Sequence, residues 1–347
     1  MPSIAIVGAS GYGGTELLRL LARHPSLEVD AIAGASSAGM PIREIAPNIP
    51  DGAGGRRVLE AVDVDRLASA DVVVLGTPDE VSLEIGPQLV AGGTRVVDLS
   101  GAFRLDAAAF ATWYGREHGA PAFASDGATP AVYGLTEHVR AALPGAALVA
   151  NPGCYPTATL LPLIPLVPLI APEGIVVSAV SGTSGAGRSS RADLQASVVH
   201  GDVVAYGAPS HRHTAEIEAH LGPDGAQAPV VFTPHLVPMS RGIHATVSAV
   251  LQPGVTHSDI DDALSEAYAD EPFVHVLPAG VFPRTKAVHG SNSCQLSAAV
   301  DERTGRVLIT SVIDNLVKGA AGQALQNVNV MLGLEETLGL DVIGVHP

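Results

Sequence analysis

The sequence predicts an α/β fold with two domains, a parallel-sheet domain followed by a strand-rich α+β domain. The chain has 347 residues, and a single hydrophobic core rarely serves more than roughly 250 to 300 residues. Short apolar strands alternate with helical segments in the first part of the chain, which is typical of a parallel sheet covered on both faces. Longer strand-like segments dominate after Leu148.

The parallel-sheet domain begins with a β-branched run that leads through glycines into a helix with the sequence TELLRLLARH. Apolar runs bounded by turn residues predict the further strands, and helical periodicity predicts the segments between them. In order, we expect strand 4–7, the first helix, strand 29–33, a helix near 65–70, strand 72–75, helix 81–90 and strand 94–99.

The second domain opens on a helical stretch that starts within NPGCYPTA. The segments IVVSAVSG, PVVFTPHLV, HATVSAVL and SCQLSAAVD then predict long strands with few helices between them. Alanine, leucine and glutamine at helical spacing predict long helices from Asn315 to the end. We therefore expect a nucleotide-binding domain at 1–148, completed by the helices of 315–347, and a catalytic and oligomerisation domain at 149–314.

Composition excludes several classes of function. The formal net charge is −16 and is spread along the chain, which argues against a nucleic-acid or anionic-membrane partner. The first residues carry no basic segment before their apolar run, so no signal peptide is expected. The most apolar stretch, 160–170, contains three prolines and is too short to span a bilayer. We expect a cytoplasmic protein.

Cysteine and histidine are not arranged as in a disulfide framework or a metal site. Only Cys154 and Cys294 occur, too few for a disulfide-stabilised chain of this size. The 13 histidines are not paired with cysteines or carboxylates at zinc-site spacing. We expect no metal.

Four glycines between the first strand and the first helix predict a dinucleotide-binding, Rossmann-type loop. Gly8, Gly11, Gly13 and Gly14 lie within seven residues, where glycine lets the backbone approach a pyrophosphate at a helix N-terminus. The spacing departs from GxGxxG, and the alternative is an ordinary strand-to-helix turn, which accounts for one glycine but poorly for four. The cofactor contacts expected in this loop are Gly8, Ser10, Gly11, Tyr12 and Gly13.

The end of the second strand favours NADP(H) over NAD. The sequence there is AGASSAGM, without the acidic residue that usually binds the ribose 2′-hydroxyl. Ser36 and Ser37 could bind a 2′-phosphate, with Arg43 nearby, although serine is also an ordinary loop residue. Thr77 and Pro78, which follow the third strand, are further expected cofactor contacts.

Cys154 is the expected nucleophile. It follows the turn formed by Pro152 and Gly153 at the start of a helix, where the helix dipole and unpaired N–H groups lower a thiol pKa. The alternative is a small buried hydrophobe, which is our interpretation of Cys294. The turn, the helix start and the polar Asn151 favour catalysis.

The segment HRHTAEIE supplies the expected proton-transfer group. His211 and His213 precede Glu216, and a thiolate nucleophile needs such a base. Alternation along an extended segment would direct both rings to one face. We rank His213 above His211.

Three arginines among glycines or serines could hold an anionic substrate: Arg104 in DLSGAFRL, Arg188 in SGTSGAGRSS and Arg241 in VPMSRGIH. A guanidinium binds phosphate through two hydrogen bonds, whereas the usual role of a single arginine is surface charge. The remaining expected site residues are Ser181 and Asn151 for the substrate, with Glu216, and Gly185 for the cofactor.

Together, GASGYGGTELLRLL, DLSGAFRL, NPGCYPTA, SGTSGAGR, HRHTAEIE, FTPHLVPMSRGI and DNLVKGAAGQALQN closely resemble the N-acetyl-gamma-glutamyl-phosphate reductase family of arginine biosynthesis. The resemblance runs nearly end to end and implies a second domain of the type found in semialdehyde dehydrogenases and glyceraldehyde-3-phosphate dehydrogenase. Aspartate-semialdehyde dehydrogenases share the glycine loop but have a different cysteine motif. Ala215 stands where the family usually has proline.

The resemblance implies attack of Cys154 on an acyl phosphate, release of phosphate, and reduction of the thioester by NADPH to an aldehyde. It implies that Arg104 contacts the phosphate, that His213 or His211 transfers protons, and that Asn315, Lys318 and Gly319 lie near the nicotinamide.

Three other functions stay open at this point: an aspartate-semialdehyde dehydrogenase-like reductase of a free amino acid, a Cys-His acyl transferase that uses no nicotinamide, and a non-catalytic NADP-binding sensor. The long strands of the second domain offer a sheet for subunit pairing. We expect a homodimer or homotetramer.

Overall fold

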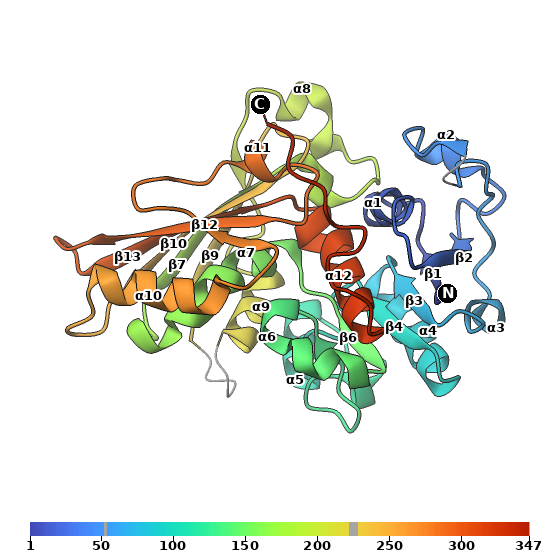
Figure 1. Cartoon of the computed structure of the whole chain (residues 1–347), viewed down its shortest axis with the longest axis horizontal. Helices are drawn as coiled ribbons and strands as arrows, with labels where there is room; N and C mark the ends of the chain where they lie inside the picture. Colours follow the sequence, from blue (N-terminus) through green and yellow to red (C-terminus); the bar gives the residue numbers. More distant parts are fainter. Residues whose placement is uncertain (52–53, 222–227, 347) are drawn as a thin grey trace. The chain divides into compact units, whose positions relative to one another are not determined.

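The computed structural model describes residues 1–51, 54–221 and 228–346 and divides the chain into two compact units (Figure 1). The first unit comprises Met1–Gly153 and Ala320–Asp341, and the second comprises Cys154–Gly319 and the tail from Val342. The division falls a few residues after the boundaries expected at 148 and 314. The tail also belongs to the second unit, whereas we expected it in the first.

The first unit contains a six-stranded parallel sheet with the strand order β2-β1-β3-β4-β6-β5. The central strands are almost wholly buried. Helices cover both faces of such a sheet, so neither face of a strand needs polar side chains. Val7 is in register with Ala33 and with Leu75, so the loops after these strands lie at one edge. The strands are β1 Ser3–Val7, β2 Glu28–Ala33, β3 Val72–Leu75, β4 Arg95–Asp98, β5 Val132–Tyr133 and β6 Leu148–Ala150.

The helices of this unit agree with the predicted periodicity except in length. Helix α1 buries Leu17, Leu20 and Leu21 at helical spacing. The helix expected at 65–70 is shorter, because the side chain of Asp63 caps it at one end and it ends before Ala68. The helices are α1 Tyr12–Leu21, α2 Ile42–Ile45, α3 Val64–Leu67, α4 Asp79–Ala91, α5 Ala107–Tyr114, α6 Thr136–Val139 and α12 Gly322–Met331, with 3-10 turns at Pro121–Phe123 and Arg140–Gly145.

Helix α12 completes the first unit with buried amide side chains as well as buried apolar ones. Gln323, Gln326, Asn327 and Asn329 are fully buried. Asn327 donates to the carbonyl of Gly134 and accepts from Thr136, while Gln323 also donates to Gly134. Buried amides are stabilising only where they are hydrogen-bonded, so this helix and the strands it covers specify each other.

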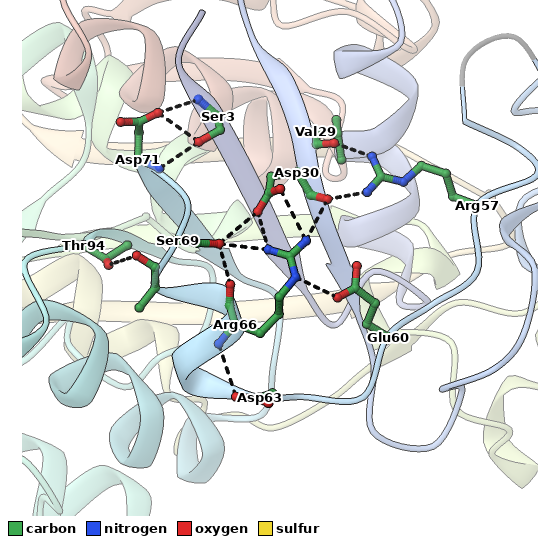
Figure 2. A network of polar contacts seen from close by, with 11 residues as sticks. Ser3, Val29, Asp30, Arg57, Glu60, Asp63, Arg66, Ser69, Asp71 and Thr94 are labelled. Atoms are coloured by element: carbon green, nitrogen blue, oxygen red, sulfur yellow. Dashed lines mark hydrogen bonds and ion pairs between the residues drawn. The ribbon is translucent and has the colours of Figure 1, made fainter.

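The outer strand of this sheet is covered by an ion-pair network (Figure 2). The guanidinium of Arg66 lies 2.6 Å from Asp30 Oδ2 and 3.2 Å from Glu60 Oε2. Arg57 donates to the carbonyls of Val29 and Asp30. These contacts satisfy backbone carbonyls that an edge strand otherwise presents to other chains.

The second unit is built on a seven-stranded mixed sheet with the order β11-β12-β13-β10-β7-β9-β8. Most neighbouring strands are antiparallel, but β7 pairs with β9 and β11 with β12 in parallel. The strands are β7 Ile175–Ser181, β8 Val204–Ala205, β9 Val230–Leu236, β10 Ile243–Val250, β11 Val274–Val276, β12 Cys294–Asp301 and β13 Arg306–Ile313. Strand β13 was absent from our prediction, although it pairs with both β10 and β12.

Two helices pack on one face of this sheet (Figure 1): α7 Cys154–Leu163 and α10 His257–Tyr268. Helix α10 was not predicted, although Thr256 and Asp259 form a capping box at its start and Ile260, Leu264 and Tyr268 are buried at helical spacing. The shorter elements are α8 Ala196–Val199, α9 His213–His220 and α11 Thr285–Val288, with 3-10 turns at Ile164–Leu169, Thr183–Ala186 and Ala192–Leu194.

The opposite face of the sheet carries a row of hydroxyl side chains. Ser178 on β7 is in register with Thr246 on β10, which is in register with Thr310 on β13. Thr233 and Ser297 extend the row on the flanking strands. Next to it lie Val176, Val231 and Leu308, which are 40%, 61% and 42% exposed.

The helical stretch predicted from Asn315 to the end of the chain extends only as far as Met331. A π-helical segment, Val317–Ala321, precedes α12, and the residues after Gly333 form turns and extended chain. The fold class itself was correct, an α/β parallel-sheet unit with a second α+β unit.

Candidate functional site

The glycine loop of the first unit is shaped by contacts between backbones. Gly8 has φ +79°, and a Cβ atom there would lie 2.2 Å from the carbonyl oxygen of Gly76. A Cβ atom at Gly14 would lie 2.5 Å from the oxygen of Gly8. At Gly11 and Gly13 a Cβ atom would meet no neighbour closer than 3.3 Å. The first and last glycines are therefore required by the turn, and the two between them leave the loop backbone uncovered by side chains.

Ser10 and Ser37 connect this loop to the end of the second strand. The hydroxyl of Ser37 donates to Ser10 Oγ at 2.8 Å, and Ser37 is buried. Ser36 is exposed beside it, and Tyr12, at the start of α1, is 39% exposed. Serine side chains thus occupy the position at which NAD-specific loops carry a carboxylate.

A second polar chain lies after β3 and β4. Ser82 donates to Asp98 at 2.6 Å and bonds Thr77 at 2.8 Å, while Ser100 donates to the other oxygen of Asp98 at 2.6 Å. Asp98 is fully buried, and burial raises the pKa of its carboxyl. Pro78 is the residue before α4. Thr77 therefore belongs to an ordered network at the carboxyl edge of the sheet.

Arg104 and Asn151 occupy buried positions in the same unit. Arg104 is 6% exposed and donates to the carbonyl of Leu99 at 2.8 Å. Asn151 is fully buried; its amide donates to Ala320 O at 3.3 Å, and its oxygen accepts from Asn327 at 3.1 Å. These contacts support a positioning role for Asn151 within the unit.

Cys154 is the first residue of α7 and is partly exposed, whereas the nine residues that follow it in the helix are buried. A Cβ atom at Gly319 would lie 2.7 Å from the Cβ of Cys154. Only glycine fits at 319 without a shift of the cysteine. The buried helix fixes the position of the thiol, and the helix start provides N–H groups and the positive end of the dipole.

An aromatic cluster surrounds the residue after the cysteine. The ring of Tyr155 lies 5.9 Å from each of His211 and His213, whose own centroids are 4.9 Å apart. The hydroxyls of Tyr155 and Tyr206 are 3.0 Å apart. Burial raises the pKa of Tyr206 to about 12, and the negative charge of Cys154 adds to this shift. The two histidines therefore pack against the residue that directly follows the predicted nucleophile.

The two histidines differ in their hydrogen bonding. The backbone N–H of His213 donates to Nδ1 of His211 at 3.2 Å, so the proton of neutral His211 resides on Nε2. Burial lowers the pKa of His211, and the charge of Arg212 lowers it further. His213 Nε2 instead lies 3.9 Å from the carboxylate of Glu216. Our expectation of an extended segment was wrong, because His213 begins helix α9.

Arg241 and Asn315 belong to a hub formed by three loops. Arg241 Nη1 lies 3.6 Å from the carboxylate of Asp314. Asn315 accepts from the N–H of Gly242 at 2.7 Å and donates to Ser184 at 3.0 Å. Gly182 and Ser184 donate backbone hydrogen bonds to the 240–242 turn. The motifs SGTSGAGR, MSRG and DNLVKG thus meet in space.

Of the remaining expected residues, Gly185 and Ser181 lie at this hub. A Cβ atom at Gly185 would lie 2.9 Å from Ser181 Oγ and 3.7 Å from the Asn315 amide. Lys318 is fully buried, with its Nζ 5.8 Å from the centroid of the Phe273 ring. Arg188 is exposed.

Sequence reasoning missed Asp314, Tyr155, Tyr206 and Ser184. Asp314 and Tyr155 adjoin residues that we named, and a charged or aromatic residue beside a proposed site residue was the available signal. Tyr206 lies in a segment without helical or strand periodicity, so no pattern identified it.

The described residues hold neither a metal-binding cluster nor a membrane span. Among residues 1–51, 54–221 and 228–346, no group of three or more His, Cys, Asp or Glu side chains could hold a metal ion. Within the same ranges, every helix is too short or too polar to cross a membrane.

Solved structures with the same fold come from aspartate semialdehyde dehydrogenases. The enzyme II of Vibrio cholerae, complexed with ASA, is 16% identical, with a TM-score of 0.71 over 96% of this chain and 98% of that one. The Candida albicans enzyme, solved with NADP, is 17% identical, with a TM-score of 0.70 over 96% and 98%. These likenesses establish the fold.

Family models define the class. The model of the semialdehyde dehydrogenase NAD binding domain matches residues 3–146, and that of the semialdehyde dehydrogenase dimerisation domain matches residues 154–315. The two models together span most of the chain and identify the class as that of semialdehyde dehydrogenases.

Full-length relatives are more specific. N-acetyl-gamma-glutamyl-phosphate reductases of Brevibacillus brevis and Geobacillus stearothermophilus are each 46% identical, and that of Alkalilimnicola ehrlichii is 45% identical, over all of both chains. The chain belongs to the N-acetyl-gamma-glutamyl-phosphate reductase family. The resemblance drawn from the sequence motifs is confirmed.

Proposed function

We propose that this protein reduces N-acetyl-gamma-glutamyl phosphate to N-acetylglutamate semialdehyde and phosphate with NADPH, in arginine biosynthesis. The observation that carries the proposal is Cys154 at the start of a buried helix, where the next residue, Tyr155, contacts the rings of both histidines. The relatives at 45% to 46% identity bear the name of this activity. A Cys-His acyl transferase would leave the glycine loop without a role.

The thiolate of Cys154 attacks the acyl carbon of the substrate. A carbon–sulfur bond forms and the bond from that carbon to the phosphate oxygen breaks, so phosphate leaves and a thioester remains. A thioester accepts hydride more readily than a carboxylate does. After reduction the carbon–sulfur bond breaks, which releases the aldehyde and restores the thiolate.

His213 is the proposed acid and base. It takes the proton of the Cys154 thiol, gives a proton to the oxygen of the reduced thiohemiacetal, and takes that proton back when the carbon–sulfur bond breaks. The carboxylate of Glu216, 3.9 Å from its Nε2, stabilises the imidazolium. His211 orients the start of α9 by accepting the N–H of His213. N–H groups at the start of α7 are donors for the oxyanion.

The phosphate end of the cofactor is proposed to bind the first unit, and NADPH, when bound, would supply the hydride that reduces the thioester. Fit is supported by Gly11 and Gly13, where an added Cβ atom would meet no neighbour closer than 3.3 Å, so the open backbone leaves room for a pyrophosphate at the start of α1. Ser10, Tyr12, Ser36 and Ser37 would hold the ribose phosphate end, and Thr77 and Pro78 would lie along the cofactor. Gly185, Asn315, Lys318 and Gly319 are the proposed residues of the nicotinamide end.

The substrate anion is proposed to bind Arg104, Arg188 and Arg241, with Asn151, Ser181 and Glu216 as polar neighbours. A guanidinium matches phosphate and carboxylate oxygens. Arg241 is the best supported of the three, because a carboxylate orients it.

The second unit is proposed to pair with another copy of the chain through the hydroxyl row and its exposed Val176, Val231 and Leu308. The matching family model is named for dimerisation. Apolar side chains beside hydroxyls on an open sheet face suit a homodimer or homotetramer.

We also propose a cytoplasmic location, since the proposed substrates are small biosynthetic metabolites and the chain carries only 2 cysteines.

The test is a stopped-flow measurement of NADPH absorbance with N-acetyl-gamma-glutamyl phosphate, aspartyl phosphate and NADH in parallel. We expect oxidation of NADPH that depends on the N-acetylated substrate, and slower reaction with NADH. Cys154→Ala should abolish turnover while NADPH still binds, since the glycine loop belongs to the first unit.

Each alternative has its own outcome. Preference for aspartyl phosphate would assign the related reductase activity. Phosphate release without NADPH oxidation would indicate an acyl transferase or hydrolase. Retained turnover in Cys154→Ala would contradict the thioester mechanism. Equal rates with NADH and NADPH would contradict the proposal that Ser36 and Ser37 bind a 2′-phosphate.

A further inference from the structure

We propose that Asp314 is a positioning residue that directs Arg241 toward the substrate anion and fixes the turn on which Gly319 approaches Cys154. The inference deepens the proposed function, on which it rests for the identity of the anion. Its evidence is a set of contacts within the second unit.

Asp314 is fully buried and its carboxylate is surrounded by donors. The N–H of Gly290 donates to Oδ2 at 2.8 Å, and the N–H groups of Leu316 and Val317 donate to Oδ1 at 2.9 and 3.3 Å. A buried carboxylate is tolerated only with such compensation. The side chain therefore holds two separate loops in a fixed relation.

Arg241 supplies the opposite charge. Its Nη1 lies 3.6 Å from Asp314 Oδ2, and its side chain is 26% exposed. An arginine side chain has several rotatable bonds, and a fixed carboxylate selects among its rotamers. Asp314 thus helps to select the direction in which this partly exposed guanidinium points.

The same residue is connected to the nucleophile through the backbone. The carbonyl of Asp314 accepts the N–H of Gly319 at 3.0 Å. Gly319 in turn lies against Cys154, where a Cβ atom would come within 2.7 Å of the cysteine Cβ. Arg241, Asp314, Gly319 and Cys154 therefore form one continuous chain of contacts.

The experiment compares alkylation of Cys154 by iodoacetate, an anion, and iodoacetamide, which is neutral, with the modified peptide measured by mass spectrometry. The ratio of the two rates reports positive charge directed at the thiol. Removal of a negative charge by Asp314→Asn would by itself raise this ratio. If Asp314 positions Arg241, the ratio instead falls, by about tenfold, as expected for loss of local electrostatic attraction.

Arg241→Gln should lower the ratio by a similar factor. In the variant that carries both Asp314→Asn and Arg241→Gln, the ratio should be no lower than in Arg241→Gln alone. This non-additivity shows that the two residues act through one effect. Asp301→Asn is the matched control, because Asp301 pairs with the exposed Arg303 at the end of β12; it should leave the ratio unchanged.

An unchanged or raised ratio in Asp314→Asn would overturn the inference, as would an unchanged ratio in Arg241→Gln. If the asparagine variant does not fold, Asp314→Glu keeps the charge but displaces the carboxylate, and the ratio should still fall. These assays need no acyl phosphate, so they stand even if the reductase activity fails. Where the activity holds, the KM for the acyl phosphate should rise at least about tenfold while the Kd for NADPH changes less than about twofold, because only the anion contact is lost.

Discussion

The glycine loop of the first unit and the surroundings of Cys154 in the second both depend on close contacts, but different atoms make them. At Gly8 and Gly14 the neighbour is a backbone carbonyl a few residues or one strand away. In the second unit the contacts join side chains and turns from distant segments: the two histidine rings lie against Tyr155, Asp314 lies against Arg241, and Gly319 lies against Cys154. In a loop packed against backbone carbonyls, an added side-chain atom should disturb the fold. In a site built from side chains, a substitution can remove a function while the fold is kept.

The largest expected effect is in the backbone-shaped region. Gly8→Ala should destabilise the protein by about 2 to 5 kcal/mol, from a left-handed φ together with overlap at 2.2 Å with a carbonyl oxygen. Chemical denaturation measures the loss, and NADPH titration should show weaker binding.

Gly39→Ala is the control for the φ effect alone. Gly39 has φ +86°, and an added Cβ atom would have no neighbour within 4 Å, so the cost should be only about 1 to 2 kcal/mol. Equal losses in the two variants would mean that the contact with Gly76 does not shape the loop.

An intermediate effect is expected in the side-chain-shaped region. His213→Asn should lower kcat by about 100-fold, as is typical for loss of a general acid or base, without loss of stability. His211→Asn should lower it less than about tenfold, because an asparagine oxygen can still accept the N–H of His213. Steady-state kinetics on both variants measure the two losses of kcat. A larger loss in His211→Asn than in His213→Asn would assign proton transfer to His211.

The smallest effect is expected for Arg66→Gln at the edge of the first sheet. Arg66 and Asp30 are each about one-third exposed, so the loss should stay below about 1 kcal/mol and shrink with salt. The hydrogen bond from Arg66 lowers the pKa of Asp30 below its ordinary value. The contribution is present above the ordinary, unfolded-state pKa and is lost as the pH falls through the lower folded-state pKa.

Urea denaturation at several pH values checks this prediction. A loss of several kcal/mol at neutral pH would show that the network in Figure 2 holds the edge strand in place rather than merely covering it.

Most of the first unit could be predicted because its signals are local. Strands such as 72–75 are continuous apolar runs, and the glycine loop joins a strand to a helix within seven residues. Strand β13 and helix α10 were missed although both carry local signals. RVLITSVI is rich in β-branched residues, and Thr256 and Asp259 form a capping box at the start of α10.

In the candidate site, the sequence indicated individual residues but not the partners that the structure gives them. Cys154 stood out by its turn and helix start, and the histidines by their density. The pairing of Arg241 with Asp314 joins residues far apart in the sequence, and so does the approach of Gly319 to Cys154. No periodicity encodes such pairs, so the sequence could name Arg241 without naming what orients it.

The buried amides of α12 also constrain how the protein is made. The carbonyl of Gly134 and the side chains of Thr136 and Asn151 receive their partners from a helix that the ribosome delivers only after residue 322. During synthesis most of the first unit leaves the ribosome early. Its buried polar groups can form their hydrogen bonds to α12 only when nearly the whole chain has been made. Its final closure is therefore a late event, and a chain that stops short of α12 exposes those groups to water or to chaperones.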